Sequence, residues 1–308
     1  GKQINLAVDL GAKGAWEESM LLEVDNYPFQ YIGKGMQSSI RMEIALSPNR
    51  IDKTDIVLLE EPENHLSHTS LNQLLNRISN KLHSKQVICT THSSFVANKL
   101  GIQNITLLEN YKTVKFTNLT DETQTFFSKL AGYDTLRFVL CKKAILVEGD
   151  SDELIVQRAY MDSNDNRLPI EDGIDVISVG TSFLRFLEIA KALHKKTTVV
   201  TDNDGSVEKL KLKYKDYIGE NEKDFIKICY DPVVQNGPLD SNDKKNNNNT
   251  LEPNLVRCNG LTLMNEILNK DFKTKECLVN YMQEEKVLSA LRIFQSNKKI
   301  TFPKYIND

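Results

Sequence analysis

Short apolar runs alternate with helical patterns through the second half of the chain. Four runs have the length and the Val, Ile and Thr content of buried strands, at residues 144–147, 174–179, 197–201 and 225–230. Residues 152–160 and 182–193, which lie between them, space their apolar side chains as a helix does. Strands that alternate with helices predict a mainly parallel sheet with helices on both faces. We therefore expect a Rossmann-like α/β domain over residues 141–308, with further helices toward the C-terminus.

The first half of the chain has a similar alternation, after two short strands at residues 4–8 and 20–24. Residues 55–59 and 86–90 read as buried parallel strands. The stretch between them places five apolar residues on one helical face: Leu71, Leu74, Leu75, Ile78 and Leu82. This βαβ pattern predicts a second site at the carboxyl ends of its strands.

The connection between the two halves predicts a hairpin and a helix. Residues 102–118 have two apolar stretches around a polar turn at residues 110–112, which is typical of a closing β-hairpin. Residues 119–140 look helical. We therefore expect a first domain at residues 1–118 and a linker helix at 119–140.

Length and composition are those of an ordinary globular protein. The 308 residues suffice for two domains, and the hydrophobic and charged fractions are 40% and 26%. No apolar run approaches the roughly 18 residues of a membrane span. The five cysteines are scattered without a C-x-x-C pair, which fits reduced thiols, so we expect a cytoplasmic protein without membrane association. The net charge of −3 neither indicates nor excludes a nucleic-acid partner.

Carboxylates follow two of the predicted strands in the second half. Glu148 and Asp152 come after the first strand, and Asp202 and Asp204 come after the third. The carboxyl ends of parallel strands share one edge of a sheet. Mg²⁺ and Mn²⁺ prefer carboxylate and water oxygens, and two such ions can stabilise the attacking and leaving oxygens of a phosphodiester. The sequence therefore predicts one shared metal site.

Helix capping is the alternative interpretation of the acids that open the following helix. Asp150, Ser151 and Asp152 all stand where a cap residue would. We expect that Asp150 only caps the helix, and that Asp152 binds metal.

Two features of the first half are suited to a nucleotide. Glu60 and Glu61 end a strand ahead of Pro62, and His92 follows the next strand. The glycine-containing loop at residues 33–39 opens a helix, and backbone N–H groups at a helix N-terminus suit a phosphate. A solvated acidic turn, a capping histidine and an ordinary loop are the alternatives.

The phosphate-binding pattern G-x-x-x-x-G-K-[ST] does not occur in the sequence. The glycine-rich segment at residues 11–14 lacks that spacing, so we interpret it as a plain turn. In the loop at residues 33–39, Ser38 and Ser39 are good cap residues for the helix that follows.

The order of these first-half motifs resembles the distal half of an ABC-type ATPase. The resemblance implies that Gly33, Gly35, Gln37 and Ser38 form a signature loop that contacts nucleotide. It further implies that Glu60 holds Mg²⁺ through water, that Glu61 orients the attacking water and that His92 contacts the γ-phosphate. Proteins of this type carry a Walker A loop near the N-terminus. We therefore expect the chain to be the C-terminal portion of a longer protein that uses ATP, and to lack ATPase activity by itself.

The second half resembles a Toprim domain, the metal-binding module of topoisomerases, primases and certain nucleases. Its hallmarks, a Glu-Gly after one strand and an Asp-x-Asp after a later one, match Glu148-Gly149 and Asp202-Asn203-Asp204. Farther along stand Thr250-Leu251-Glu252, a Lys286-x-x-x-Ala290-Leu291 helix and a Phe302-Pro-Lys-Tyr-Ile306 tail. An ABC lobe followed by Toprim with these elements is similar to the OLD (overcoming lysogenization defect) family, which are ATPase-linked nucleases that include anti-phage effectors of the Gabija and retron types.

The OLD resemblance implies roles for particular residues. Glu148 and Asp152 hold one metal, Asp202 and Asp204 contribute to a shared or second ion, and Thr250 and Glu252 complete the cluster. Lys286 stabilises charge at the scissile phosphate, although an exposed helix lysine is the alternative. Several lysines are candidates for DNA contacts: Lys195, Lys196, Lys244, Lys245, Lys298 and Lys299. A solvated basic surface is the alternative for these lysines, and residues 246–249 predict a mobile loop.

A metal-dependent DNA endonuclease or nickase, coupled to an ATPase lobe, is the function that these patterns favour. Its expected partners are DNA, further copies of the chain through the ATPase lobe, and a protein or RNA–DNA element of a defence system. The alternative is a non-catalytic DNA-repair scaffold or binding protein. The complete acidic set argues against that alternative, because a scaffolding Toprim domain can dispense with those acids.

Overall fold

The computed structural model describes residues 4–8, 20–82, 84–109, 112–115, 119–129, 135–235 and 247–308. The chain divides into two compact units between Gly101 and Ile102, and each unit is described by itself. The predicted turn at residues 11–14 lies outside the described residues.

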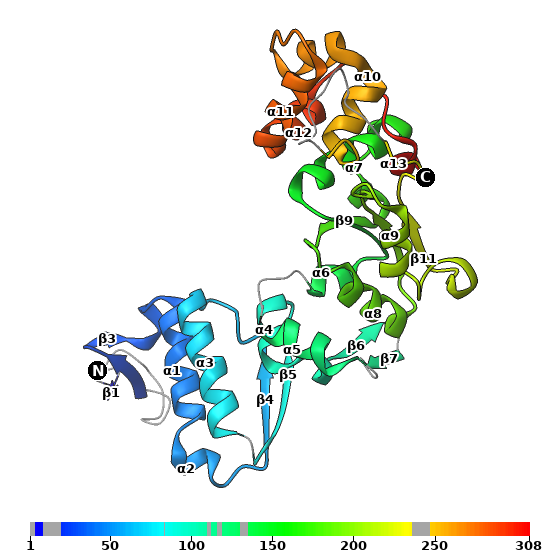
Figure 1. Ribbon diagram of the computed structural model, residues 1–308. Coiled ribbons are helices and arrows are strands. Elements are labelled where there is room, and N and C mark those ends of the chain that lie inside the picture. Colours follow the sequence, from blue (N-terminus) through cyan, green and yellow to red (C-terminus); the bar gives the residue numbers. More distant parts are fainter. Residues whose placement is uncertain are drawn as a thin grey trace. The chain divides into compact units, whose positions relative to one another are not determined.

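The first unit contains two small sheets and four α-helices within its described residues (Figure 1). An antiparallel sheet has the order β1-β2-β3, with strands β1 (Ile4–Val8), β2 (Met20–Val24) and β3 (Tyr27–Pro28). A 3₁₀ turn, η1 (Phe29–Tyr31), leads to α1 (Lys34–Ala45) and α2 (Pro48–Ile51). The βαβ unit consists of β4 (Ile56–Glu60), α3 (His68–Lys81) and β5 (Gln86–Thr90), followed by α4 (Ser94–Leu100). Strands β4 and β5 pair in parallel, as the sequence predicts.

The core of the first unit lies on one face of the β4–β5 pair. The predicted apolar face of α3 packs there, with Leu75 and Val96 buried against Val57 and Leu59 of β4. The opposite face carries apolar side chains that remain exposed, namely Ile56, Leu58 and Ile88. The prediction of fully buried strands is therefore wrong for this pair, because helices cover one face of it within the described residues.

The second unit is built around four parallel strands. Its first elements are η2 (Ile102–Asn104), the antiparallel hairpin β6 (Thr106–Glu109) and β7 (Lys112–Lys115), and helices α5 (Asp121–Lys129) and α6 (Thr135–Leu140). The sheet segment follows as β8 (Lys143–Val147), α7 (Asp150–Ser163), η3 (Pro169–Asp172), β9 (Ile174–Ser178), α8 (Phe183–Leu193), β10 (Lys196–Val200), α9 (Val207–Lys213), η4 (Gly219–Asn221) and β11 (Ile226–Cys229). The chain ends with α10 (Leu251–Leu268), α11 (Lys275–Glu284), α12 (Lys286–Gln295) and α13 (Lys304–Asn307).

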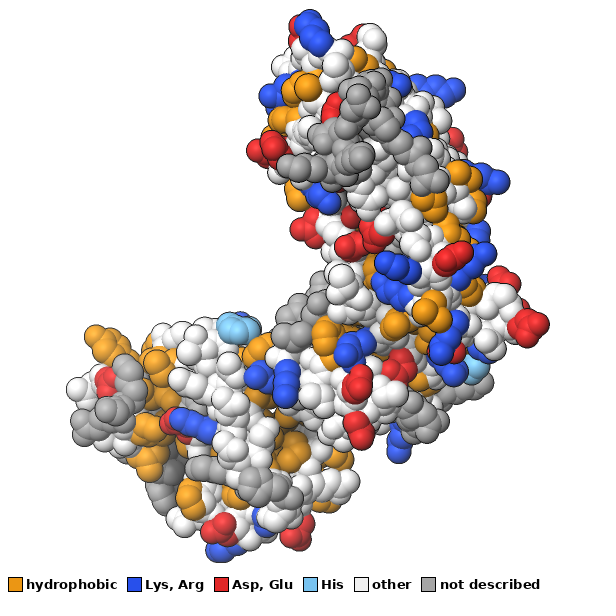
Figure 2. All heavy atoms as spheres, in the orientation of Figure 1, with side chains coloured by type: hydrophobic (Ala, Val, Ile, Leu, Met, Phe, Trp, Pro, Cys, Tyr) orange, Lys and Arg blue, Asp and Glu red, His pale blue; other side chains and the backbone are white. Residues whose placement is uncertain are grey.

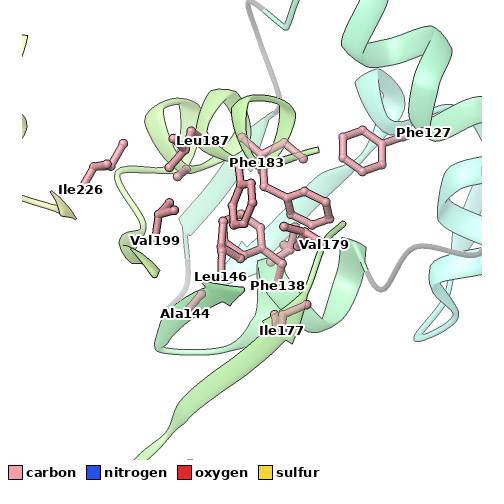
Figure 3. Packing of buried hydrophobic residues seen from close by; sticks show 14 of the residues in the cluster. Phe127, Phe138, Ala144, Leu146, Ile177, Val179, Phe183, Leu187, Val199 and Ile226 are labelled. Atoms are coloured by element: carbon pink, nitrogen blue, oxygen red, sulfur yellow. The ribbon is translucent and has the colours of Figure 1, made fainter. Parts of the chain in front are cut away.

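Alternate residues of the four strands point to opposite faces and build two cores. The strand order is β11-β10-β8-β9, and every pairing is parallel. On one face, Leu146 and Val199 pack against α5, α6 and α8, where Phe127, Phe138 and Phe183 gather over the strands (Figure 3). On the other face, strand residues such as Val147 and Val200 pack against α7 and α13. The predicted parallel sheet with helices on both faces is confirmed.

Helix α7 is shared between the sheet and the C-terminal helices. Val156 of α7 belongs to the core under the sheet, whereas Ile155 and Ala159 face a separate core made with α10, α11 and α12. Figure 1 shows α7 lying beside α12 in this unit. The helix therefore couples the sheet to the C-terminal helices.

A buried arginine fastens α12 to α7. The Arg158 side chain is almost fully buried, and it pairs with Asp162 at 2.7 Å on its own helix. Its guanidinium donates to four backbone carbonyls at and beyond the end of α12, those of Ile293, Phe294, Ser296 and Lys298. A rigid five-donor fork can satisfy all these acceptors, whereas a lysine ammonium cannot.

The segment at residues 119–140 does not behave as a linker. Leu119, Phe127 and Phe138 are buried in the main core of the second unit, and Phe127 and Phe138 contact Phe186 edge-on at 5.2 and 5.4 Å between ring centroids. The hairpin β6–β7, which the sequence assigns to the first domain, also falls in the second unit. The units therefore divide earlier than the predicted end at residue 118, because α5 and α6 bury their apolar faces on the sheet.

Replacing Arg158 with Lys tests the fastening of α12. We expect the free energy of unfolding to fall by about 2–4 kcal/mol, because the buried carbonyls lose donors that water cannot replace. Urea unfolding followed by circular dichroism measures the change. Arg167→Lys is the matched control, since the Arg167 side chain is 52% exposed where it pairs with Asp172, and we expect less than about 0.5 kcal/mol there. Equal effects at the two positions would contradict the role of Arg158.

Candidate active site

The acids of the second unit collect where the strand order reverses. From β8 the chain crosses to β9 on one side, and it later returns to β10 on the other side of β8. Ligands bind in open α/β sheets at such a switch point, beside the carboxyl ends of the strands. Leu146 of β8 pairs with Val199 of β10, so the residues that follow each strand emerge side by side. Glu148 and Asp202 are the acids that this register brings to the same edge.

Asp152 caps the helix that carries it. Its Oδ2 accepts the backbone N–H of Gly149 at 3.2 Å and the Ser151 hydroxyl at 3.4 Å. Asp150 is the exposed first residue of α7. The prediction that Asp150 serves as a cap is therefore wrong, because it is Asp152, one turn into the helix, that reaches back to Gly149. Asp152 thus combines a capping contact with a position beside the other acids.

Both oxygens of Asp202 have donors. Its Oδ2 accepts the N–H of Leu251, the first residue of α10, at 2.9 Å. Its Oδ1 accepts the hydroxyl of Tyr305 on α13 at 2.8 Å. The sequence patterns assigned no role to Tyr305 beyond membership of the C-terminal tail. A carboxylate that follows β10 is therefore oriented by two elements from the end of the chain.

Glu252 brings α10 to the same cluster. It is 4% exposed, its Oε2 accepts the Thr250 hydroxyl at 3.2 Å, and its Oε1 lies 3.7 Å from Nζ of Lys286 at the start of α12. The Gln283 side chain also reaches Thr250, at 3.4 Å. Lys286, which is remote from Thr250 and Glu252 in the sequence, is therefore brought beside Glu252 by the fold.

Burial and mutual repulsion perturb the pKa values of these acids. Burial raises the pKa of Asp202 to about 8; the Tyr305 hydrogen bond opposes this shift, whereas the charges of Asp152, Glu252 and Asp204 add to it. Burial, with the charges of Glu252 and Glu148, raises the pKa of Asp152 to about 6. Burial and the neighbouring Asp202 also raise the pKa of Tyr305, so its hydroxyl keeps the proton that it donates.

This donor set suits a divalent cation, although the side chains do not already surround one. The acids are near enough to repel one another and are partly removed from water, and both effects are relieved when a cation binds. Among the described residues, no three His, Cys, Asp or Glu side chains stand in a ligating arrangement. Carboxylates that repel one another are expected to stay apart until an ion draws them together, so we regard the residue set as fitting Mg²⁺ or Mn²⁺.

The first unit brings its predicted nucleotide residues together in a second cluster. Nε2 of His92 lies 3.2 Å from Oε1 of Glu61. Glu61 adopts a left-handed backbone with φ of 41°, while its N–H donates to Thr90 at 2.9 Å. This strained residue directly follows β4 and turns its side chain toward the residues after β5. Glu60 stands at the exposed end of the same strand.

Glu63 is a member of this cluster that the sequence patterns did not single out. Its Oε1 accepts the Thr91 hydroxyl at 2.6 Å and the N–H of His92 at 2.9 Å. Asn64 donates to Oε2 of Glu61 at 2.7 Å. Glu63 therefore holds the backbone of His92, while Asn64 holds the side chain of Glu61. The only sequence signal for Glu63 was its place in the acidic run after Glu60.

The glycine loop has a packing role that the sequence did not predict. Helix α1 begins at Lys34 with Gly33 as its cap residue, so Ser38 lies inside the helix and the expected cap at Ser38 and Ser39 is wrong. A Cβ on Gly35 would lie 2.4 Å from the carbonyl oxygen of His65. The Gln37 side chain donates to the carbonyls of Ile32 and Gln30, at 2.9 and 3.3 Å. Gln37 is therefore engaged by the loop that precedes α1.

Two domain families match the chain. Residues 139–204 match the Toprim domain of proteins like the overcoming lysogenization defect protein. Residues 25–98 match an AAA domain family described as a candidate AbiEii toxin of a type IV TA system. The chain has the two domains of an OLD-family nuclease. No curated protein matches it.

The predicted lysines take different positions around the Toprim sheet. Lys195 is buried, and its Nζ donates to the carbonyls of Val139, at 2.7 Å, and Cys141. Its predicted DNA contact is therefore wrong, because the ammonium is used inside the fold. Lys196 opens β10 and so lies at the edge opposite the acids, roughly 16 Å away along a five-residue strand.

The remaining lysines include two exposed ones. Lys298 pairs with Glu266 at 2.7 Å, and Lys299 is exposed beside it. Lys244 and Lys245 lie outside the described residues. Figure 2 shows basic and acidic side chains interspersed over the visible face of this unit. None of the described helices combines the length and the apolar composition that a bilayer crossing requires.

The asparagine run is more ordered than the sequence predicts, as far as it is described. Asn248 and Asn249 are buried, and Asn249 exchanges hydrogen bonds with the backbone of Gln235, at 2.7 and 3.3 Å. Asn247 donates to Asp204 at 3.5 Å. Residues 247–249, where the sequence predicts a mobile loop, therefore hold hydrogen bonds with the Gln235 backbone and with Asp204. Asp204 itself is exposed, with a φ of 48°.

The raised pKa values predict how the stability of the Toprim domain depends on pH. The pKa of Asp202 is about 8 in the folded protein and near 4 in the unfolded chain, so the folded state binds this proton more tightly. The folded state therefore holds more protons in that window, and stability in EDTA falls as pH rises from about 4 to 8. The melting temperature measures this fall in stability, and we expect the fall to be smaller in Asp202→Asn. Asp271→Asn is the control that should leave the fall unchanged, because the Asp271 side chain is 84% exposed. An identical pH profile in Asp202→Asn would contradict the assignment.

Gly35→Ala tests the contact between α1 and His65. Alanine favours a helix by about 1 kcal/mol over glycine, yet its Cβ would overlap a backbone carbonyl. We expect a net loss of about 1–3 kcal/mol in the AAA domain, measured by urea unfolding. Gly33→Ala is the control, because a Cβ there meets no described atom within 4 Å, and we expect it to cost less than about 1 kcal/mol. A stabilised Gly35→Ala protein would contradict the contact.

Proposed function

We propose that the Toprim domain of this chain is a metal-dependent DNA endonuclease or nickase. The observation that carries the proposal is the convergence of acids from β8, α7, β10 and α10 at the switch point of a parallel sheet, with Lys286 beside them. The Toprim match indicates a nuclease, which is a hydrolase. DNA as the substrate and nicking as the outcome are the finer parts of the proposal.

Glu148, Asp152, Asp202, Thr250 and Glu252 would hold the metal, with Asp204 at its exposed edge. Two bound Mg²⁺ or Mn²⁺ ions would stabilise the attacking and leaving oxygens of the phosphodiester. The residues of the chain supply the geometry. Thr250 fixes one oxygen of Glu252, and the N–H of Leu251 fixes one oxygen of Asp202.

Lys286 supplies positive charge at the open side of the cluster. Its side chain is 54% exposed, while the side chain of its partner Glu252 is 5% exposed. The ammonium is therefore accessible to a substrate phosphate, yet it remains within 3.7 Å of a buried acid. A compact point charge placed in this way can stabilise the charge that develops on a phosphate oxygen.

In the AAA domain, Glu60, Glu61 and His92 are the residues that we assign to ATP. Glu60 would hold Mg²⁺, Glu61 would orient a water and His92 would contact the γ-phosphate. The Glu61–His92 contact of 3.2 Å and the support that Glu63 gives to His92 favour this assignment. We propose that ATP use in the intact protein controls the nuclease, and that the system acts in anti-phage defence.

Plasmid nicking tests the nuclease. Supercoiled plasmid is incubated with MgCl₂ or MnCl₂ and wild-type protein, Glu148→Gln, Asp202→Asn or Lys286→Met. We expect the rate of nicking to fall by at least about 100-fold in each variant, and to vanish in EDTA. Asp271→Asn is the matched control on the exposed surface.

Two results would contradict the proposal. Equal nicking by wild type, Glu148→Gln and Asp202→Asn would place the activity elsewhere. DNA binding that persists without nicking in either metal would favour the non-catalytic scaffold.

A further inference from the structure

The hydroxyl of Tyr305 joins the C-terminal helix α13 to the acid that follows β10. Tyr305 is 4% exposed, and its hydroxyl donates to Oδ1 of Asp202 at 2.8 Å. The other oxygen of Asp202 is occupied by the N–H of Leu251. Asp202 and Tyr305 are separated by 103 residues, so only the folded chain makes this contact.

Packing fixes the tyrosine ring in place. Tyr305 lies in the core under the sheet with Val147, Val156 and Val200, from β8, α7 and β10. The segment that leads to it is held at two further points. Phe302 is buried against the C-terminal helices, and Asn259 exchanges hydrogen bonds with the backbone of Thr301 at 2.8 Å in each direction. The hydroxyl of Tyr305 therefore has little freedom to follow Asp202 if the carboxylate rotates.

Tyr305 and Asp202 both line a small cavity. Asp152, Asp202, Leu251 and Tyr305 are among the residues that line a space of about 10 Å³, which is room for about one water or ion. A carboxylate has about four lone-pair sites. Because one site on each oxygen of Asp202 is taken, the remaining sites are held in a fixed direction relative to Asp152.

A neutral donor is well suited to this place. An arginine or lysine would also bind Asp202, but its charge would compete with a cation for the carboxylate. A phenol orients the same oxygen without adding charge. Asn254 of α10 also influences the hydroxyl, and its own side chain accepts from Arg257 at 2.5 Å.

We infer that Tyr305 is a positioning residue that holds Asp202 in the orientation required for binding a divalent metal. The inference rests on the proposed function, because it concerns the same metal cluster. Residues that hydrogen-bond metal ligands from behind commonly change metal affinity or activity by about 10–100-fold when they are replaced. Tyr305 would act through Asp202, with no contact of its own to substrate.

Tyr305→Phe removes the hydroxyl and keeps the ring in its core. We expect the Kd for MnCl₂, measured by calorimetry on the whole chain, to rise by about 10–100-fold. The melting temperature in EDTA should change by no more than about 3 °C, while the rise in melting temperature on adding MnCl₂ should shrink. Tyr160→Phe is the matched control, because that hydroxyl also donates to a carboxylate, Asp172, at 2.7 Å, away from the cluster.

A double variant separates positioning from general stability. If the hydroxyl acts through Asp202, Tyr305→Phe adds no further loss of Mn²⁺ affinity to Asp202→Asn. Additive losses would overturn the inference. So would an unchanged Mn²⁺ affinity in Tyr305→Phe, whether or not its melting temperature in EDTA falls.

The same measurements distinguish failure of the inference from failure of the proposed function. If Asp202→Asn loses Mn²⁺ affinity and Tyr305→Phe does not, the inference alone is overturned. If wild-type protein binds no Mn²⁺ and does not nick plasmid, the proposed function is overturned together with it. Should Tyr305→Phe fold poorly, Asn254→Ala changes the surroundings of the hydroxyl and provides the comparison. A smaller rise in Kd is expected there, and an unchanged Kd would contradict the inference.

Discussion

Repulsion among carboxylates at one end of a parallel sheet is the constraint on which the second unit depends. The sheet delivers Glu148 and Asp202 from neighbouring strands, while Asp152 and Glu252 arrive on helices. Burial and mutual repulsion raise the pKa values of Asp202 and Asp152. A fold that keeps such groups together must hold them with donors or counter-charges, and the Leu251 N–H, the Tyr305 hydroxyl and the Lys286 ammonium have that role.

The C-terminal helices supply most of those supports. Helix α10 gives an N–H to Asp202, α12 places Lys286 beside Glu252, and α13 brings the Tyr305 hydroxyl. These helices are themselves anchored through α7, by a shared apolar core and by Arg158. The sheet, α7 and the C-terminal helices are therefore packed together around the acids. A change far from the cluster, such as loss of Arg158, would loosen it through α12.

The AAA domain also brings charged side chains together beyond the ends of two paired strands. Glu61, His92 and Glu63 come from segments that follow two paired strands, and a left-handed residue turns Glu61 toward His92. Gly35 is required by a close backbone approach to His65. Glycine in this loop therefore has a steric reason that is independent of any phosphate.

Periodicity and strand-end chemistry were enough to predict the parallel sheet, the acids at its edge and the positions of Glu61 and His92 after neighbouring strands, because each depends on local sequence and on the fixed direction of parallel strands. Local sequence could not assign the role of Tyr305 or the burial of Lys195, since each is decided by contacts with segments that are remote along the chain. The division between the units was set by the burial of Phe127 and Phe138, which a helical pattern alone does not reveal. The sequence by itself determined that carboxylates lie at the carboxyl edge of the sheet. Tertiary structure alone decided which side chains hold that chemistry in place, because a hydrogen bond such as Tyr305–Asp202 exists only once packing has brought its two ends together.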